Sequence, residues 1–264
     1  MLMEVKNQIK ISILTVKYAI MREMLNKASF IMNIVFMILN NASFIIQWVV
    51  LFSIKDNIGG YNLREVLLLW GFAASTYGIS RFFFKKAFNL SDIINTGKLD
   101  SFLVQPKNVL ISAITTDVEP SALGDMLYGF ICLLIYGVNL KTFILFTILS
   151  ICGALIITSM TIIFNSLSFW FSKSDLLAEK VDGLMSNFAT YPDGIFKGTV
   201  KMLLYTLIPV GIANYLPVRI IIDFNSFLII VVLIFTIIIV LLAFIIFYRG
   251  LKRYSSSNLM IARI

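Results

Sequence analysis

The sequence predicts an all-α integral membrane protein. Its 264 residues are 59% hydrophobic and only 14% charged, with a mean hydropathy of +0.92. That is more apolar sequence than the core of a soluble domain holds. Five apolar stretches and a sixth, interrupted one predict six transmembrane helices in a single domain, residues 1–264. The net charge of +8 is spread over the ends of these stretches. It therefore indicates contact with lipid headgroups and not with nucleic acid.

Residues 1–28 predict an amphipathic helix that lies in the membrane interface. Apolar residues recur every three or four positions with lysines between them: Val5, Ile9, Ile13, Val16, Ile20 and Met24. Such a stripe beside a basic face suits the headgroup region. A core helix of a soluble domain is the alternative, but the chain offers no soluble domain to contain it.

The first predicted span is 30–53, long enough to cross about 30 Å of hydrocarbon. It carries Asn33, Asn40 and Gln47 at seven-residue spacing, which places the three amides on one side of a helix. Amides that faced lipid would lack hydrogen-bond partners, so we expect them to face protein or a water-filled path. Interhelical hydrogen bonds at a dimer interface and contact with a transported molecule are both open interpretations.

The second predicted span is 66–84. Gly71, Ser75 and Gly78 form a strip of small residues that predicts close packing against another helix. Arg81 lies near the end of the span, where its long side chain can reach the inner membrane surface.

Residues 85–110 are the longest polar passage of the chain and predict a cytoplasmic segment, because they carry Lys85, Lys86, Lys98 and Lys107. Ser91 is placed to cap a short helix, and Gly97 to end it in a left-handed conformation. Asp100 is then placed to cap a second helical turn that Pro106 stops. An ordinary interfacial loop and a rigid element that transmits force from a soluble partner are both compatible with this pattern.

After an interfacial stretch, 111–121, the third and fourth spans are predicted at 122–138 and 142–164, joined so tightly that they must be antiparallel neighbours. Three acids near the inner end of the third span have two interpretations, a proton relay or ordinary capping and pairing. They are Asp117, Glu119 and Asp125.

A short inner loop is predicted at 172–182. Residues 184–217 follow, and prolines and glycines interrupt them too often for one straight span. We expect an outward crossing and then a broken, partly re-entrant excursion, in which Pro192, Pro209 and Pro217 shape an outer gate. An inner interfacial helix before a crossing at 201–217 is the alternative. The last span, 224–248, has essentially one polar side chain within its apolar run, Thr236.

The distribution of basic residues predicts that both termini are cytoplasmic. With six crossings, sixteen of the 22 lysines and arginines lie inside, and the inverted topology would reverse the bias. The six on the outer side are Lys55, Arg64, Lys141, Lys197, Lys201 and Arg219.

Residues 94–106, INTGKLDSFLVQP, contain the pattern G-x-L-D-x-x-L-x-x-P. This pattern resembles a signature of the small six-span permeases of bacterial type-2 ABC exporters. Three further stretches are similar to that family in the same order: 189–192, 207–217 and 250–254. Two residues depart from it, Gln105 where many members carry a basic residue and Lys107 where an apolar one is common.

The resemblance implies a permease subunit of an ATP-driven exporter in the bacterial cytoplasmic membrane. The permease would hold no cofactor, because ATP and Mg²⁺ bind a separate cytoplasmic ATPase subunit. A second permease, identical or paralogous, would complete the pathway. The segment 85–110 would contain the helix that couples to the ATPase, with Ser91, Asp92, Gly97, Lys98, Leu99, Asp100 and Pro106 as the coupling residues.

Motifs of other function classes are absent from the sequence. Gly97-Lys98 lacks the upstream glycine of a phosphate-binding loop, and no hydrolase or metalloprotease motif occurs. The chain has no histidine, and Cys132 and Cys152 lie in apolar stretches, so no metal site and no catalytic residue is expected. The alternatives are a proton-driven secondary transporter, a membrane-embedded enzyme and a structural membrane scaffold. The first two need ionisable groups near mid-membrane, which the clear spans almost entirely lack.

Overall fold

The computed structural model describes residues 2–171 and 174–255, and this part of the chain is helical without a β-sheet. The long helices are α1 (Leu2–Glu23), α2 (Lys27–Ile54), α3 (Leu63–Phe84), α7 (Ala122–Tyr136), α8 (Leu140–Ser166), α9 (Ser174–Ala189) and α12 (Ser226–Leu251). Shorter elements follow α3: η1 (Lys85–Asn89), α4 (Leu90–Asn95), α5 (Asp100–Leu103) and α6 (Val109–Ile114). The others are η2 (Leu167–Phe169), η3 (Asp193–Ile195), α10 (Gly198–Tyr205), the π-helical turn η4 (Gly211–Tyr215) and α11 (Leu216–Ile222).

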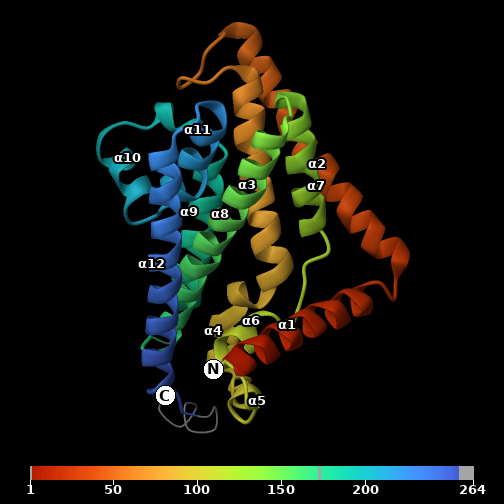
Figure 1. Ribbon diagram of the computed structural model, residues 1–264, viewed down its shortest axis with the longest axis vertical. Helices are drawn as coiled ribbons and strands as arrows, with labels where there is room; N and C mark the ends of the chain where they lie inside the picture. The colour runs from red at the N-terminus through yellow and green to blue at the C-terminus, as the bar shows by residue number, and fades with distance from the viewer. Residues whose placement is uncertain (1, 172–173, 256–264) are drawn as a thin grey trace.

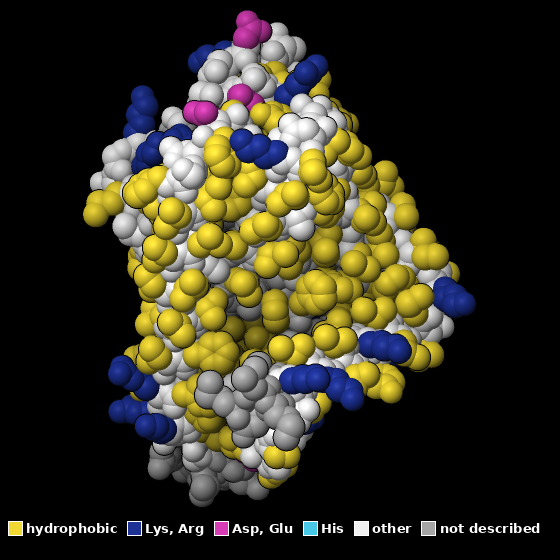
Figure 2. Space-filling view, in the orientation of Figure 1, with side chains coloured by type: hydrophobic (Ala, Val, Ile, Leu, Met, Phe, Trp, Pro, Cys, Tyr) yellow, Lys and Arg dark blue, Asp and Glu magenta, His cyan; other side chains and the backbone are white. Residues whose placement is uncertain are grey.

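The long helices lie side by side between two ends of different character (Figure 1). The short helices α4, α5 and α6 form one end, here named the α4 end, and both ends of the described chain lie there. The elements α10 and α11 lie at the opposite end, here named the α10 end. Helix α1 runs across the molecule near the α4 end and turns sharply into α2. Figure 2 shows a broad band of apolar side chains, with most lysines and arginines above and below it.

Asparagine caps start the helices at the α10 end. Asn62 accepts a hydrogen bond from the amide of Glu65, whose carboxylate accepts from the amide of Asn62. Asn139 and Thr142 form the same reciprocal arrangement at the start of α8, and Asn225 caps α12. Each cap satisfies amides that have no partner within the helix. The loops 55–62 and 137–139 are therefore sharp turns between neighbouring helices.

Four helical segments are long and apolar enough to cross a membrane: Lys27–Ile54, Leu63–Asn95, Leu140–Phe169 and Ser226–Leu251. They coincide with the predicted first, second, fourth and last spans. Helix α7 lies where the third span was predicted but has only 15 residues. At 1.5 Å per residue it covers about 22 Å, less than the hydrocarbon thickness of about 30 Å. By length and composition the described residues contain four candidate spans, and six spans remain a prediction.

Helix α3 is the centre of the fold. In the most apolar stretch of this span 83% of the residues are buried, whereas the corresponding shares are 11% in α2 and 22% in α12. Its small-residue strip packs on α7 as predicted, because a Cβ added at Gly78 would lie only 2.8 Å from the carbonyl oxygen of Ala122. Thr236 of α12 is buried and donates back to the carbonyl of Val232, so the polar side chain in the middle of the last span is satisfied within its own helix.

The interval 172–217 differs from the prediction. The inner loop expected at 172–182 is helical from Ser174, and its first two residues lie outside the described chain. Helix α9 runs on to Ala189, and the broken part follows as η3, α10, η4 and α11. The charged side chains of 175–182 suggested a loop, but Asp182 forms an ion pair with Arg81 of α3, 2.8 Å apart, that satisfies it within the fold. The alternative crossing at 201–217 is divided among α10, η4 and α11, and it stays a prediction.

Candidate functional site

The α4–α5 segment, residues 90–104, contains most of the residues that the sequence selected. Helix α4 ends at Asn95, and Gly97 follows with φ +74°, which confirms the predicted left-handed stop. The two expected caps are wrong. Ser91 lies inside α4, and Asp100 is the first residue of α5 instead of the capping residue before it. The reason is that Leu99 already adopts helical backbone angles, so α5 begins one residue earlier than the pattern suggested.

Ser91 anchors α4 to α8 through Asn165. Its hydroxyl donates to Oδ1 of Asn165 over 2.6 Å, and its amide donates to the same oxygen over 3.2 Å. The Asn165 amide group donates in turn to the carbonyl of Thr161, over 2.9 Å. All of these groups are buried, where losing a hydrogen bond costs about 1–3 kcal/mol. The segment is therefore fixed to a long helix, and part of the polar passage is enclosed by protein instead of water.

Apolar side chains complete this attachment. Leu90, Ile94 and Leu99 are fully buried, in a cluster shared with α6, the end of α8 and the end of α12. The tip of the segment is different, because Leu103 is 42% and Val104 is 84% exposed. The α4–α5 segment thus has a buried base and an apolar tip that nothing in the described chain covers.

The other selected residues of this segment lie on its surface. Lys98 and Asp92 form an exposed ion pair at 2.9 Å, which contributes little to stability. Pro106 is exposed after the end of α5 and faces α1 beside Gln8. Burial and the neighbouring Asp100 raise the pKa of the Tyr254 phenol, which places Asp100 next to the chain that follows α12.

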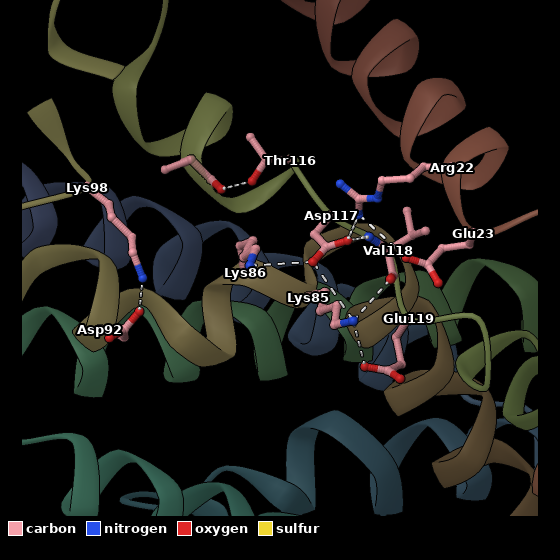
Figure 3. A network of polar contacts seen from close by, with 11 residues as sticks. Arg22, Glu23, Lys85, Lys86, Asp92, Lys98, Thr116, Asp117, Val118 and Glu119 are labelled. Carbon is pink, nitrogen blue, oxygen red and sulfur yellow. Dashed lines mark hydrogen bonds and ion pairs between the residues drawn. The ribbon is translucent and has the colours of Figure 1, made fainter. Parts of the chain in front are cut away.

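An ion-pair network ties α1 to this end of the fold (Figure 3). Asp117 forms a close ion pair with Arg22 of α1 and lies 3.4 Å from Lys86. Lys85 lies 3.4 Å from Glu119. Two of the three acids in question are therefore paired with cations, as expected for capping and pairing and not for a proton relay. Helix α1 also turns Val16 and Ile20 towards Phe82 and Val118, so part of its apolar stripe packs on protein.

A cleft of about 500 Å³ opens between α2, α3, α7 and α9. Five aromatic side chains line it, together with polar groups from all four helices. They are Phe44, Trp48, Trp70, Tyr77 and Tyr191. Asp125, the third acid in question, lines the cleft as well and accepts a hydrogen bond from Asn41 over 2.6 Å. The volume suits a small organic molecule.

The side chains of the three amides in the predicted stripe on α2 form no hydrogen bond with other described residues. Asn33, Asn40 and Gln47 are exposed, and Gln47 borders the cleft. Asn41, one position away from the stripe, is the amide that packs inward on α7. The stripe therefore faces outward from the described fold, and its expected partner stays a prediction.

A buried carboxylate organises the α10 end. Asp193 is 1% exposed and lies 2.7 Å from Arg219 and 3.2 Å from Lys201. The hydroxyl of Tyr61 donates to it over 3.0 Å, and Tyr205 reaches it at 3.4 Å. Burial raises the pKa of Asp193, but Arg219 and the other donors outweigh burial and hold it below its usual range. Four segments thus meet at one carboxyl group.

The three prolines of the predicted outer gate surround this centre. Pro192 directly precedes Asp193, Pro209 precedes η4, and Pro217 lies in the first turn of α11, two residues before Arg219. All three are buried. The structure brings the prolines to one end of the molecule, and their role as a gate is not tested by it.

Sequence reasoning missed three residues that organise the fold: Asp193, Asn165 and Asn41. A local signal existed for Asp193, because Pro192-Asp193-Gly194 is a charged turn within an apolar interval, flanked later by Lys201 and Arg219. Asn41 lies within the predicted first span and Asn165 directly follows the predicted fourth span, and each gave only its polarity as a signal.

Comparison with known proteins was made for the whole chain. The family model described as an ABC-2 family transporter protein matches residues 37–258. The chain belongs to this family. No curated protein and no solved structure gives a significant match.

As an ABC-2 family transporter protein, the chain is a multi-pass integral membrane protein of the cell membrane and a component of membrane transport. The family associates with ABC ATPase partners. The match covers α3 to α12 and most of α2, so it includes the α4–α5 segment, the cleft and the Asp193 centre, while α1 precedes it.

Proposed function

We propose that this ABC-2 family transporter protein is the permease subunit of an ATP-driven exporter. It forms half of the translocation pathway, and ATP with Mg²⁺ is bound and hydrolysed on a separate cytoplasmic ABC ATPase. The α4 end is then cytoplasmic, as the positive charge near both termini favours. The observation that carries the proposal is the α4–α5 segment, with its buried base and its uncovered apolar tip.

A segment built in this way can transmit force. Its base shares one apolar cluster with the ends of α8 and α12, and Ser91 bonds it to Asn165. A push on the tip is therefore passed to two long helices instead of being absorbed by a flexible loop. The exposed Leu103 and Val104 suit an apolar groove on a soluble ATPase.

The second half of the pathway is supplied by another permease, identical or paralogous. In support, only 11% of the residues in the most apolar stretch of α2 are buried, and Asn33 and Asn40 lie on its exposed surface. Amides at that depth need partners that lipid cannot provide. A second permease beside α2 satisfies them and closes the cleft that Gln47 borders.

Exported molecules leave at the α10 end, where Pro192, Pro209 and Pro217 hold a broken backbone around Asp193. Irregular backbone near membrane depth is tolerated when it packs on protein, as it does here. Two further crossings, by α7 and α9, complete six spans with both termini inside.

The test uses the ABC ATPase that is retained when the protein is purified in mild detergent. Val104→Asp places a charge on the apolar tip and is expected to lower ATPase retention by about tenfold or more, since burying an unpaired charge costs several kcal/mol. Ile54→Asp is the matched control, because Ile54 is similarly exposed, at 80%, at the α10 end. Failure to retain any ATPase, or equal retention by both variants, would contradict the proposal.

A further inference from the structure

The cleft between α2, α3, α7 and α9 has a charge balance that selects a class of ligand. Three charged residues line it: Arg81, Glu119 and Asp125. Arg81 is neutralised by Asp182 of α9, at 2.8 Å, and Glu119 by Lys85, at 3.4 Å. Asp125 forms no ion pair within the described chain. The cleft therefore contains one carboxylate that has no ion-pair partner in the described chain.

Asp125 is held in place by a hydrogen bond to one of its two carboxylate oxygens. Its Oδ1 accepts a hydrogen bond from Asn41, which in turn donates to the carbonyl of Met37 one turn earlier in α2. No hydrogen bond within the described residues reaches its Oδ2. The carboxylate is thus held at the wall of the cleft by one oxygen, and the other oxygen is left for a cation or a hydrogen-bond donor.

The remaining wall is aromatic. Phe44 and Trp70 are stacked with their ring centroids 5.0 Å apart, and Trp48 meets Tyr191 edge-on at 6.0 Å. The negative faces of such rings attract cations, most strongly those of tryptophan, when water is excluded. Aromatic faces around one carboxylate are the arrangement that recognises organic cations.

Tyr77 adds a further aromatic ring to the wall of the cleft. Its side chain lines the cleft and is 8% exposed, and its hydroxyl has no hydrogen-bond partner within the described chain.

We propose that this cleft binds the transported molecule, and that this molecule is an organic cation with an apolar or aromatic body. Its charged centre lies at Asp125, and its body lies against Trp48 and Trp70. Anions are excluded because the only lining cation, Arg81, already pairs with Asp182. The inference rests on the proposed function for its role in transport, and binding itself is measured without ATP or ATPase.

The experiment uses the full-length protein in nanodiscs and two probes of equal shape and opposite charge, radiolabelled tetraphenylphosphonium and tetraphenylborate. Empty nanodiscs give the lipid-partitioned background. Saturable binding of tetraphenylphosphonium, at one site per chain and without saturable binding of tetraphenylborate, is expected. Asp125→Asn keeps the hydrogen bond with Asn41 and removes the charge, and is expected to raise Kd about tenfold or more. Asp125→Glu retains the charge and is expected to stay within about threefold of the wild type.

Trp70→Leu is expected to raise Kd and Trp70→Phe to restore it in part, which separates a ring face from simple bulk. Asp56→Asn, an exposed acid in the loop after α2, is the charge control and leaves Kd unchanged. The inference is overturned if both probes bind alike, if neither saturates, or if Asp125→Asn, eluting as a monodisperse protein, binds like the wild type. A preparation that retains its ATPase yet fails this test overturns the cation site and leaves the proposed function standing.

Discussion

The Ser91 hydroxyl lies 2.6 Å from Oδ1 of Asn165, and this contact joins a six-residue helix at the edge of the fold to a 27-residue helix that crosses it. Seventy-four positions separate the two residues in sequence. Because Asn165 is itself bonded to the carbonyl of Thr161, the short helix shares the rigidity of α8. Movement of the α4–α5 segment must therefore be accompanied by movement of α8.

Ser91→Ala is expected to loosen this attachment. It removes the two hydroxyl contacts among the three hydrogen bonds to Asn165 and leaves the one from the Ser91 amide, which costs about 1 kcal/mol, too little to unfold the protein. Export per ATP hydrolysed is expected to fall in the reconstituted complex, while expression is unchanged. Ser101→Ala is the control, because the exposed Ser101 hydroxyl bonds only to the carbonyl of Lys98. Equal transport by the two variants would contradict a coupling role for Ser91.

Gly97→Val is expected to disturb coupling by strain. Its φ of +74° disfavours a β-branched residue by about 1–2 kcal/mol, so the turn between α4 and α5 shifts. We expect lower ATPase retention or less export per ATP. Gly60→Val carries a similar strain at the α10 end, where φ is +88° and a Cβ meets no atom within 4 Å. That variant is expected to couple normally, and equal coupling losses in the two would indicate a general effect of strain.

Asp193→Asn is expected to destabilise the α10 end. It leaves Arg219 and Lys201 without their shared carboxylate. These cations are 46% and 40% exposed, so water solvates them and the cost lies below the roughly 3–5 kcal/mol of a fully buried pair. Limited proteolysis between α9 and α12 is expected to speed up in this variant. Asp56→Asn, in an exposed loop, serves as the control for loss of one acid.

The same centre predicts a pH dependence. Arg219 and its neighbours hold the pKa of Asp193 below the unfolded value of about 3.9, so its stabilisation is full above about pH 4 and is lost as the pH falls through the folded pKa. The wild type is expected to become more susceptible to an acid protease between α9 and α12 below pH 4. Asp193→Asn is expected to lack that step, and an identical pH profile in both would remove Asp193 as its cause.

The stripe on α2 is expected to face a second permease. Cysteines placed at Asn33, Asn40 or Gln47, in a background lacking Cys132 and Cys152, are expected to react slowly with a lipid-soluble thiol reagent in the assembled complex. Cysteines at Val35 and Leu39, which are exposed on the same helix, are expected to react readily. Strong reaction of all three stripe positions and none of the neighbours would place the amides in lipid.

Local patterns in the sequence were enough for most of the helical architecture. A helix that crosses hydrocarbon must be apolar along its whole length, so the spans at 30–53, 66–84, 142–164 and 224–248 could be read directly and coincide with α2, α3, α8 and α12. Gly97 was predictable for a similar reason, since a left-handed turn is a property of one residue and its neighbours.

Only the tertiary structure decided what the polar residues do. Asp182 suggested a loop until Arg81 of α3 was seen beside it, and Ser91 suggested a helix cap until Asn165 was seen to accept its hydrogen bond. Asp193 meets Tyr61 across 132 positions of sequence. A buried polar group is stable only if a partner lies within about 3 Å, and that partner is chosen by how distant helices pack, not by the residues next to it in sequence.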